Sequence, residues 1–180
     1  IDPQVPVICF GGTGVGLTAN GSGGAAPYSY LWNTGETTQT VIAGATGIYW
    51  VEISDTLDCG SVRDSITVTA FTSPITANAG PNDAVCEDSP TYSLDGTITE
   101  ATGGTWSGGD GVFLPDENTI DATYTPTAAE IAFGSVTLTL TSTGNSGCTA
   151  ESASMTLTIN PMEDPSFTYS AASFCQSDAD

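Results

Sequence analysis

The sequence predicts an all-β protein built from tandem β-sandwiches of immunoglobulin type. Two observations support this prediction: apolar and polar residues alternate along almost every segment, and clusters of Gly, Pro, Asn and Asp separate the segments. Alternation with a period of two is the pattern of a half-buried strand, and frequent turns between short strands are typical of sandwiches. A chain of 180 residues is long enough for two such domains. Each would span about 70 to 90 residues, and one continuous sandwich is the alternative.

Strands in the first half of the chain follow from alternation between turns. The stretch PYSYLWNTGE (27–36) places Tyr28, Tyr30 and Trp32 two residues apart, so we expect these aromatic side chains on the inward face of a central strand. Alternation in the later strands predicts further inward sets, namely Tyr49, Val51 and Ile53, followed by Ile66, Val68 and Ala70. The expected strands are 5–10, 14–20, 28–33, 38–43, 48–54 and 61–70.

A proline-containing stretch, FTSPIT (71–76), interrupts the pattern and predicts a short linker before strands resume. One helical turn is expected in PTAAEIAFG, where Thr127 and Glu130 have the spacing of a capping box. The inward residues of the last two strands are Val136, Leu138 and Leu140, then Met155, Leu157 and Ile159. The expected strands are 75–79, 83–87, 91–98, 104–107, 119–124, 135–142 and 152–160.

These elements divide the chain into an expected first domain at 1–72, a second at 73–161, and the start of a further repeat at 162–180. The last part follows from its composition, because small and apolar residues lead into Cys175 much as ITANAGPNDAVC leads into Cys86. With its start at Ile1, the chain is expected to be a segment of a longer secreted protein.

The chain is strongly acidic, with 21 Asp and Glu, one cation (Arg63), no His and a formal net charge of −20. Such a surface repels phosphate backbones and anionic headgroups, which argues against nucleic acid and membrane-surface partners. No apolar run is long enough to insert in a membrane. The charge either keeps an extracellular protein soluble or collects counterions, divalent cations among them.

Five cysteines without a Cys-x-x-Cys pair or any His indicate an oxidised, extracellular protein rather than a zinc site. In a sandwich of this type the first and last strands run side by side. We therefore expect disulfides Cys9–Cys59 and Cys86–Cys148, one within each domain. Cys175 is left over, and its partner lies either beyond residue 180 or on another chain.

Carboxylates in the expected turns make calcium the one candidate cofactor. Ca²⁺ prefers oxygen ligands on loops, although no EF-hand spacing is present, and solvated turns explain the same residues. The candidate ligands are Asp83, Glu87, Asp88, Asp110, Asp116 and Glu117.

Leu31 and Trp50 alternate out of phase with the inward sets, on strands that neighbour each other in this type of sandwich. They would form a small exposed apolar patch, which marks contacts between chains or modules. Together with Cys175 they are the candidate interface residues. The alternative is that the second domain or a loop covers them.

Catalysis is not expected. The chain has no His to act as a base and no Lys to act as a nucleophile, and its acidic clusters lie in turn-rich sequence. The stretch GGTGVG (11–16) superficially suggests a phosphate loop, but it lacks the following Lys and a predicted helix. It is interpreted as a turn between two strands.

Residues 7–59 resemble the SprB-type repeat of Bacteroidetes surface adhesins. The shared sequence features are Cys9 with Gly11-Gly12, the string SGGAAPYSYLWNTGETTQT, and the alternating stretch GIYWVEISD, which is followed by Cys59. Residues 75–160 resemble the PKD-like repeat of the same giant proteins, through GGTWSGGDGVF and YTPTAAEIAFGSVTLTLTSTGN. Trp50 and Leu31 depart from the family pattern, which more often has polar residues there.

This resemblance implies a very long cell-surface protein of gliding or surface-attached bacteria, exported by the type IX system and attached to the outer membrane. The expected function is a structural and adhesive stalk or fibre, with neighbouring repeats, other copies of the chain or surface polysaccharide as partners. A subunit of a self-assembling extracellular filament and a carbohydrate-binding module are the alternatives.

Overall fold

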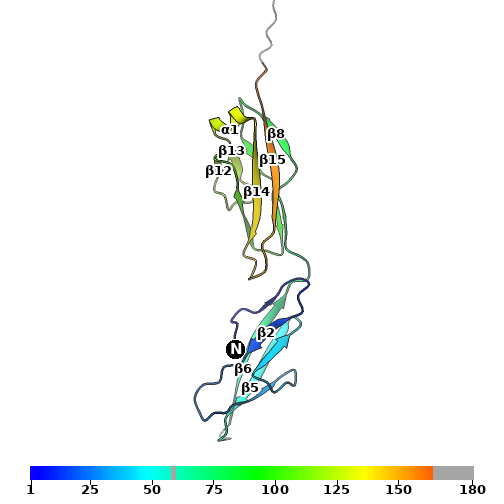
Figure 1. Ribbon diagram of the computed structural model, residues 1–180, viewed down its shortest axis with the longest axis vertical. Helices are drawn as coiled ribbons and strands as arrows, with labels where there is room; N and C mark the ends of the chain where they lie inside the picture. Colours follow the sequence, from blue (N-terminus) through cyan, green and yellow to red (C-terminus); the bar gives the residue numbers. More distant parts are fainter. Residues whose placement is uncertain (58–59, 164–180) are drawn as a thin grey trace, which may run out of the picture.

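The computed structural model describes residues 1–57 and 60–163, which form two β-sandwiches arranged end to end along the long axis of the molecule (Figure 1). We call residues 1–70 module one and residues 75–160 module two. Each module has its own cluster of buried apolar side chains. The expected further repeat at 162–180, with Cys175, falls almost wholly outside the described residues.

Module one packs a four-stranded sheet against a two-stranded sheet. The large sheet has the order β1-β6-β5-β3, in which β1 runs parallel to β6 and the other neighbours are antiparallel. Its strands are β1 (Val7–Ile8), β6 (Ser61–Ala70), β5 (Gly47–Ser54) and β3 (Ser29–Trp32). The small sheet pairs β2 (Val15–Thr18) with β4 (Thr40–Ala43).

The core of module one lies between these sheets and confirms the inward sets predicted for β5 and β6. Trp32 is paired with Val51, and both side chains are fully buried. The indole Nε1 of Trp32 donates a hydrogen bond of 2.8 Å to the Thr38 carbonyl, so burial leaves no polar atom of this ring unpaired. The prediction that Tyr28 faces inward is wrong: Tyr28 lies before β3 and is not part of this core, and its hydroxyl donates to the Gly23 carbonyl.

Module two repeats the arrangement on a larger scale. One sheet has the order β11-β14-β15-β8, and β8 runs parallel to β15 as β1 does to β6. Its strands are β11 (Gly103–Ser107), β14 (Ser135–Thr143), β15 (Ser152–Asn160) and β8 (Asp83–Cys86). The opposing strands are β12 (Val112–Leu114), β13 (Thr123–Thr125) and β9 (Tyr92–Ser93), with β10 (Thr97–Thr99) paired to β7 (Thr76–Asn78).

The core of module two is built from the predicted inward residues of β14 and β15, together with Trp106 and Tyr124. Leu138 and Leu140 of β14 and Leu157 of β15 are completely buried. Burial of each such side chain contributes about 1.5 to 3 kcal/mol. The threonines between them line the outer face, where Thr139 and Thr141 hydrogen-bond to serines of β15.

The expected strand 91–98 is interrupted in the structure, where β9 and β10 pair with different partners. Leu94, Asp95 and Gly96 separate the two strands. A Cβ at Gly96 would lie 2.8 Å from a methyl of Leu140 and 2.9 Å from the ring of Trp106. The backbone therefore approaches the core closely at this point, which only glycine permits.

The predicted helical turn is confirmed as α1 (Ala128–Phe133), with Thr127 as the N-cap. The Thr127 side chain accepts a hydrogen bond from the Glu130 backbone N–H, and the Glu130 carboxylate accepts one from the Thr127 N–H, which completes the capping box. The helix ends at Gly134, whose φ of 88° is the left-handed conformation usual at this position.

Candidate functional site at the junction between the modules

A disulfide between Cys9 and Cys148 joins the two modules. Cys9 follows β1 of module one, and Cys148 lies in the connection between β14 and β15 of module two. Their Cα atoms are 5.7 Å apart, although 139 residues separate them in the sequence. The covalent link therefore encloses module one after Cys9 and module two as far as Cys148 in one loop, and leaves β15 outside it.

The two cysteines meet because of where the neighbouring strands end. The Phe71 N–H donates a hydrogen bond of 2.9 Å to the Ile8 carbonyl, so Cys9 stands beside the point where β6 leaves module one. On the other side, the Cys148 N–H donates to the Asn145 carbonyl, and Asn145 Nδ2 donates to the Ser142 carbonyl. These bonds fold the β14–β15 connection into a compact turn that presents Cys148 to module one.

Other contacts hold the short linker in place. Ser73 Oγ of the linker donates to Glu100 Oε1 of module two at 2.5 Å. The Ala70 N–H, at the end of β6, donates to Thr46 Oγ1 within module one at 2.8 Å. Ile75 is only 8% exposed. Each end of the linker is thus anchored to the module that it adjoins.

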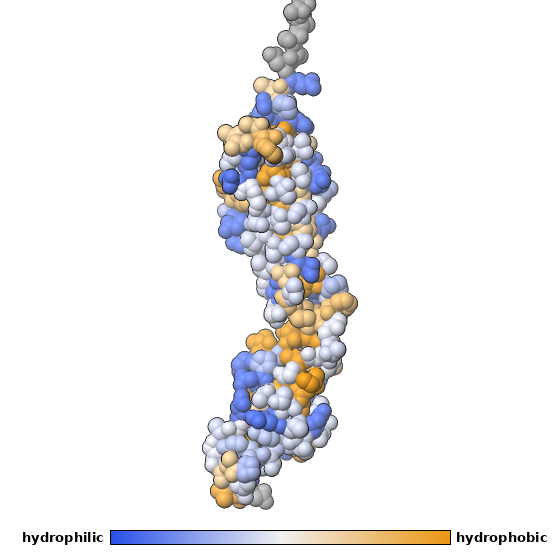
Figure 2. Space-filling view, in the orientation of Figure 1, coloured by the Kyte–Doolittle hydropathy of each residue, from blue (hydrophilic) through white to orange (hydrophobic). Residues whose placement is uncertain are grey.

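An open hollow lies at the junction, and its lining combines the disulfide with apolar side chains. Figure 2 shows apolar surface gathering on module one and around the waist between the modules. Phe10, next to the disulfide, remains 55% exposed. The lining residues are Cys9, Phe10, Phe71, Pro74, Ile75, Cys148, Thr149 and Glu151.

The expected disulfides Cys9–Cys59 and Cys86–Cys148 are therefore wrong. β6 spans ten residues, so its start and its end lie about 30 Å apart. Cys9 lies beside the end of β6, whereas Cys59 comes just before its start in the sequence and lies outside the described residues. Cysteines whose Cα atoms are more than about 7 Å apart cannot bond without backbone movement.

Module two has the same geometry. Cys86 pairs with Asn160 at the end of β15, whereas Cys148 precedes the start of β15. The two cysteines therefore lie at opposite ends of the module. Cys86 is a free, exposed cysteine.

The candidate interface residues Leu31 and Trp50 lie on the outward face of the large sheet of module one. Leu31 is 46% exposed, and its register partner on β5 is Glu52. The guanidinium of Arg63 lies over the Trp50 ring at 3.9 Å and forms an ion pair of 3.0 Å with Glu52. The patch predicted from sequence is thus partly covered by the chain's one basic side chain, a contact that the sequence analysis missed.

The candidate calcium ligands do not come together. No group of three His, Cys, Asp or Glu side chains able to hold a metal ion occurs within residues 1–57 and 60–163. Several of these residues are engaged locally instead. Asp116 Oδ1 accepts from the Asn118 N–H and from Thr119 Oγ1, and the Asp110 N–H donates to Glu130. Asp83, Glu87, Asp88 and Glu117 occupy β8, the turn after it, and the loop before β13.

Glu130 is the most heavily bonded carboxylate of module two. Burial opposes its ionisation, but hydrogen bonds from the Thr127 N–H, the Tyr124 hydroxyl and the Asp110 N–H outweigh burial and hold its pKa below the ordinary value. Burial and the contact with Glu130 raise the pKa of the Tyr124 hydroxyl. The group therefore stabilises the helical end of module two and holds no proton ready for catalysis near neutral pH.

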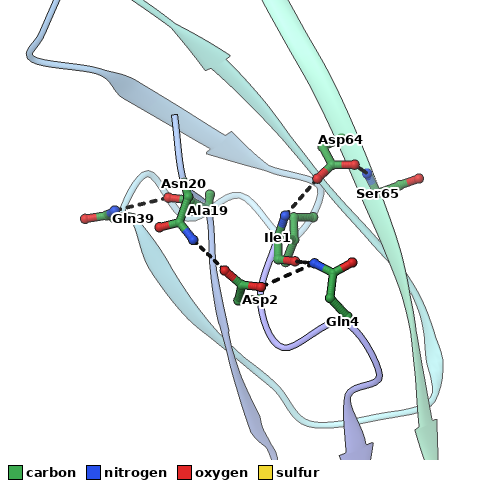
Figure 3. A network of polar contacts seen from close by, with 8 residues as sticks. All are labelled: Ile1, Asp2, Gln4, Ala19, Asn20, Gln39, Asp64 and Ser65. Carbon is green, nitrogen blue, oxygen red and sulfur yellow. Dashed lines mark hydrogen bonds and ion pairs between the residues drawn. The ribbon is translucent and has the colours of Figure 1, made fainter. Parts of the chain in front are cut away.

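A second polar network ties the first residues of the chain to both sheets of module one (Figure 3). The α-amino group of Ile1 lies 2.8 Å from Asp64 Oδ2 on β6, and this hydrogen bond lowers the pKa of Asp64. Asn20 Nδ2 donates to Asp2 Oδ2 at 2.6 Å, and Gln39 Nε2 donates to the Ala19 carbonyl. The network holds the first residues of the chain against both sheets, and we interpret its role as structural.

No helix within the described residues has the length and apolar character needed to cross a bilayer.

Comparison with known proteins gives one family. Residues 1–37 match the family model of the SprB repeat. This supports the first part of the resemblance, whereas the PKD-like resemblance of residues 75–160 remains a prediction. No curated protein matches the chain.

Similar solved structures are multidomain β proteins of low identity. The fibronectin(III)-like modules of Clostridium thermocellum CbhA are 9% identical with a TM-score of 0.49, over 93% of this chain and 97% of that one. The N-terminal domains of the Hoc capsid protein of bacteriophage RB49 are 14% identical with a TM-score of 0.48, over 90% and 68%. Domains of Drosophila OTK are 12% identical with a TM-score of 0.45, over 87% and 59%.

Proposed function

We propose that this chain is a tension-bearing segment of a large adhesive protein on the bacterial cell surface. Its modules form a stalk that displays binding surfaces at a distance from the cell. The observation that carries the proposal is the disulfide between Cys9 and Cys148, which joins consecutive modules instead of stapling each one internally.

The disulfide suits this function because of the path that tension takes through the chain. A pull on the two ends passes from the first residues through Cys9 and Cys148 to β15. The 139-residue loop between the cysteines lies outside that covalent path. Only β1 and β15 lie on that path, so the other strands of both sandwiches can remain folded under a force that unfolds an unlinked sandwich.

The SprB match at residues 1–37 supports the finer parts of the proposal. The parent protein is a giant secreted adhesin of a bacterium of the Bacteroidetes, exported by the type IX system, held at the outer membrane and used in gliding or surface attachment. The acidic surface and the disulfide agree with an extracellular location. Its partners are neighbouring repeats, other copies and surface polysaccharide.

A carbohydrate-binding module is less well supported. Its main sequence support was an exposed Trp50, and sugars bind by stacking on free aromatic faces. Arg63 already lies over the Trp50 ring at 3.9 Å and is paired with Glu52. A sugar would have to displace this contact or use the other side of the ring.

Imaging tests the proposed function against the filament alternative. Antibodies raised against residues 1–163 should label thin strings of beads that extend from intact cells in electron micrographs. Labelling confined to the cell interior would contradict the proposal. Helical fibres of regular pitch, assembled from the purified chain, would favour a self-assembling filament subunit instead.

A further inference from the structure

We infer that Cys86 is one half of a second intermodule disulfide, whose partner is a cysteine in the last hairpin of a β-sandwich stacked on the Asn160 end of module two. This inference rests on the end-to-end stacking in the proposed function. It concerns a junction beyond the one that the structure contains.

The first argument is that Cys86 occupies the position in module two that Cys9 occupies in module one. Each cysteine comes at the end of a short strand that runs parallel to the last strand of its module. Ile8 is paired with Ala70 just before Cys9, and Val85 is paired with Ile159 just before Cys86. Each therefore stands where the chain leaves its module.

The second argument is local backbone geometry. The Cys9 carbonyl accepts a hydrogen bond of 2.8 Å from the N–H of Gly12, three residues on. The Cys86 carbonyl accepts one of 3.1 Å from the N–H of Ser89, also three residues on. The same turn thus follows both cysteines, and one of the two is already bonded to the next module.

The third argument is the surface around Cys86. An open hollow borders its exposed side chain, as another borders the Cys9–Cys148 disulfide. Met162, on the segment that leaves module two, is 65% exposed beside it. The residues that line this hollow are Cys86, Asp88, Asn160, Pro161, Met162 and Glu163.

The fourth argument is the placement of cysteines in the sequence. Each module has one cysteine at the end of the strand that runs parallel to its last strand, namely Cys9 or Cys86, and one in the connection before its last strand, namely Cys59 or Cys148. In module two these positions lie at opposite ends, so they serve two different junctions. If the next module stacks on the Asn160 end and has its cysteines at the same two positions, the cysteine before its last strand lies next to Cys86.

The chemistry is the oxidation of two thiols. Sγ of Cys86 and Sγ of the partner cysteine form the new S–S bond and together release two protons and two electrons. A thiol–disulfide oxidant accepts them, and its own S–S bond breaks to give two thiols. Oxidised glutathione can serve as this oxidant in the test.

The test extends the chain by one module of known sequence. Residues 1–160 are followed directly by a second copy of residues 72–160, so that the spacing from the last strand reproduces that of the first junction. After oxidation by glutathione, free thiols are alkylated and the disulfides are mapped in non-reduced peptides. We expect Cys86 of the first copy to lose alkylation and to be linked to Cys148 of the second copy. In the matched Cys86→Ser variant, Cys148 of the second copy should become fully alkylated.

Two results overturn the inference. One is full alkylation of Cys86 in the extended chain while the Cys9–Cys148 link is intact, and the other is a link from Cys86 to Cys59 or to another molecule. Loss of Cys9–Cys148 itself would instead contradict the proposed function. The same map, made from the protein secreted by its own cells, gives a test that does not depend on how the added module folds. Cys86 must be joined there to the cysteine in the last hairpin of a later module. A free Cys86, or a bond from Cys86 to Cys175, also overturns the inference.

Discussion

Cys9 and Cys148 are bonded across the boundary between two separately folded cores, with 139 residues of chain between them. The bond connects the exit of module one to a hairpin turn of module two. It therefore restricts how the modules move relative to one another, and it places module one after Cys9 and module two as far as Cys148 inside one covalent loop.

Removal of this bond should destabilise the pair of modules. In the chain-entropy description, a loop of 139 residues contributes up to about 5 kcal/mol when both modules unfold together. We expect Cys148→Ser to lower the thermal midpoint and to broaden the distribution of intermodule angles, as measured by calorimetry and small-angle X-ray scattering. Cys86→Ser is the matched control and should change neither quantity. Equal midpoints for the two variants would argue against a stabilising role for the bond.

Replacement of Glu130 by Gln should weaken the helical end of module two. The carboxylate accepts hydrogen bonds from the Tyr124 hydroxyl and from the N–H groups of Asp110 and Thr127. Loss of such bonds costs about 1 to 3 kcal/mol of unfolding free energy at pH 7, which urea unfolding can measure. Glu36→Gln, an exposed change in module one, should have almost no effect.

The effect of Glu130 should also depend on pH. Its pKa in the folded protein is below the ordinary 4.5, so its stabilising contribution is fully present above that value and is lost as the pH falls through the lowered folded pKa. The difference in unfolding free energy between the natural chain and Glu130→Gln should therefore shrink below about pH 4. A difference that stays constant down to pH 2 would show that the charge of Glu130 is irrelevant.

Gly96→Ala should destabilise module two through overpacking. The added Cβ would lie 2.8 Å from Leu140 and 2.9 Å from Trp106, both in the core. Overpacking of this kind costs about 1 to 3 kcal/mol. The matched control is Gly47→Ala, because a Cβ at Gly47 meets no atom within 4 Å. Urea midpoints that are equal for the two variants would contradict the close approach at Gly96.

Trp50→Ser should leave the fold intact and weaken lateral association between copies of the chain. Trp50 lies on the outward sheet face, so its loss removes apolar surface without opening the core. Sedimentation velocity over a range of concentrations measures the association. Ile42→Ser on the opposite sheet is the control, since Ile42 is 66% exposed. If the natural chain and Trp50→Ser are both monomeric at every concentration, the patch is not a self-association surface.

Local pattern was sufficient to predict most strands and their inward faces, because burial of alternate residues is decided within a strand, although β12 (Val112–Leu114) was missed and Tyr28 was wrongly placed inward. Val51, Val68, Leu138 and Leu157 were assigned correctly for this reason. The break at Gly96 was not predicted, because it arises from close packing against Leu140, which is distant in the sequence.

The disulfides were predicted wrongly because pairing depends on which end of a module each cysteine reaches. A parallel first strand places Cys9 beside the end of β6, about 30 Å from the start of that strand. Counting residues along the expected strand 61–70 would have revealed the conflict. The contact between Arg63 and Trp50 was also within reach, since the two residues lie near each other on neighbouring expected strands.

Single-molecule force spectroscopy tests the central claim most directly. The chain is pulled through handles on its two ends, first oxidised and then with a reductant present. We predict that the oxidised chain extends only by the residues outside the Cys9–Cys148 loop, and that reduction releases the 139-residue loop, an additional length of about 480 Å. Unfolding of both modules to their full length without reductant would contradict the account.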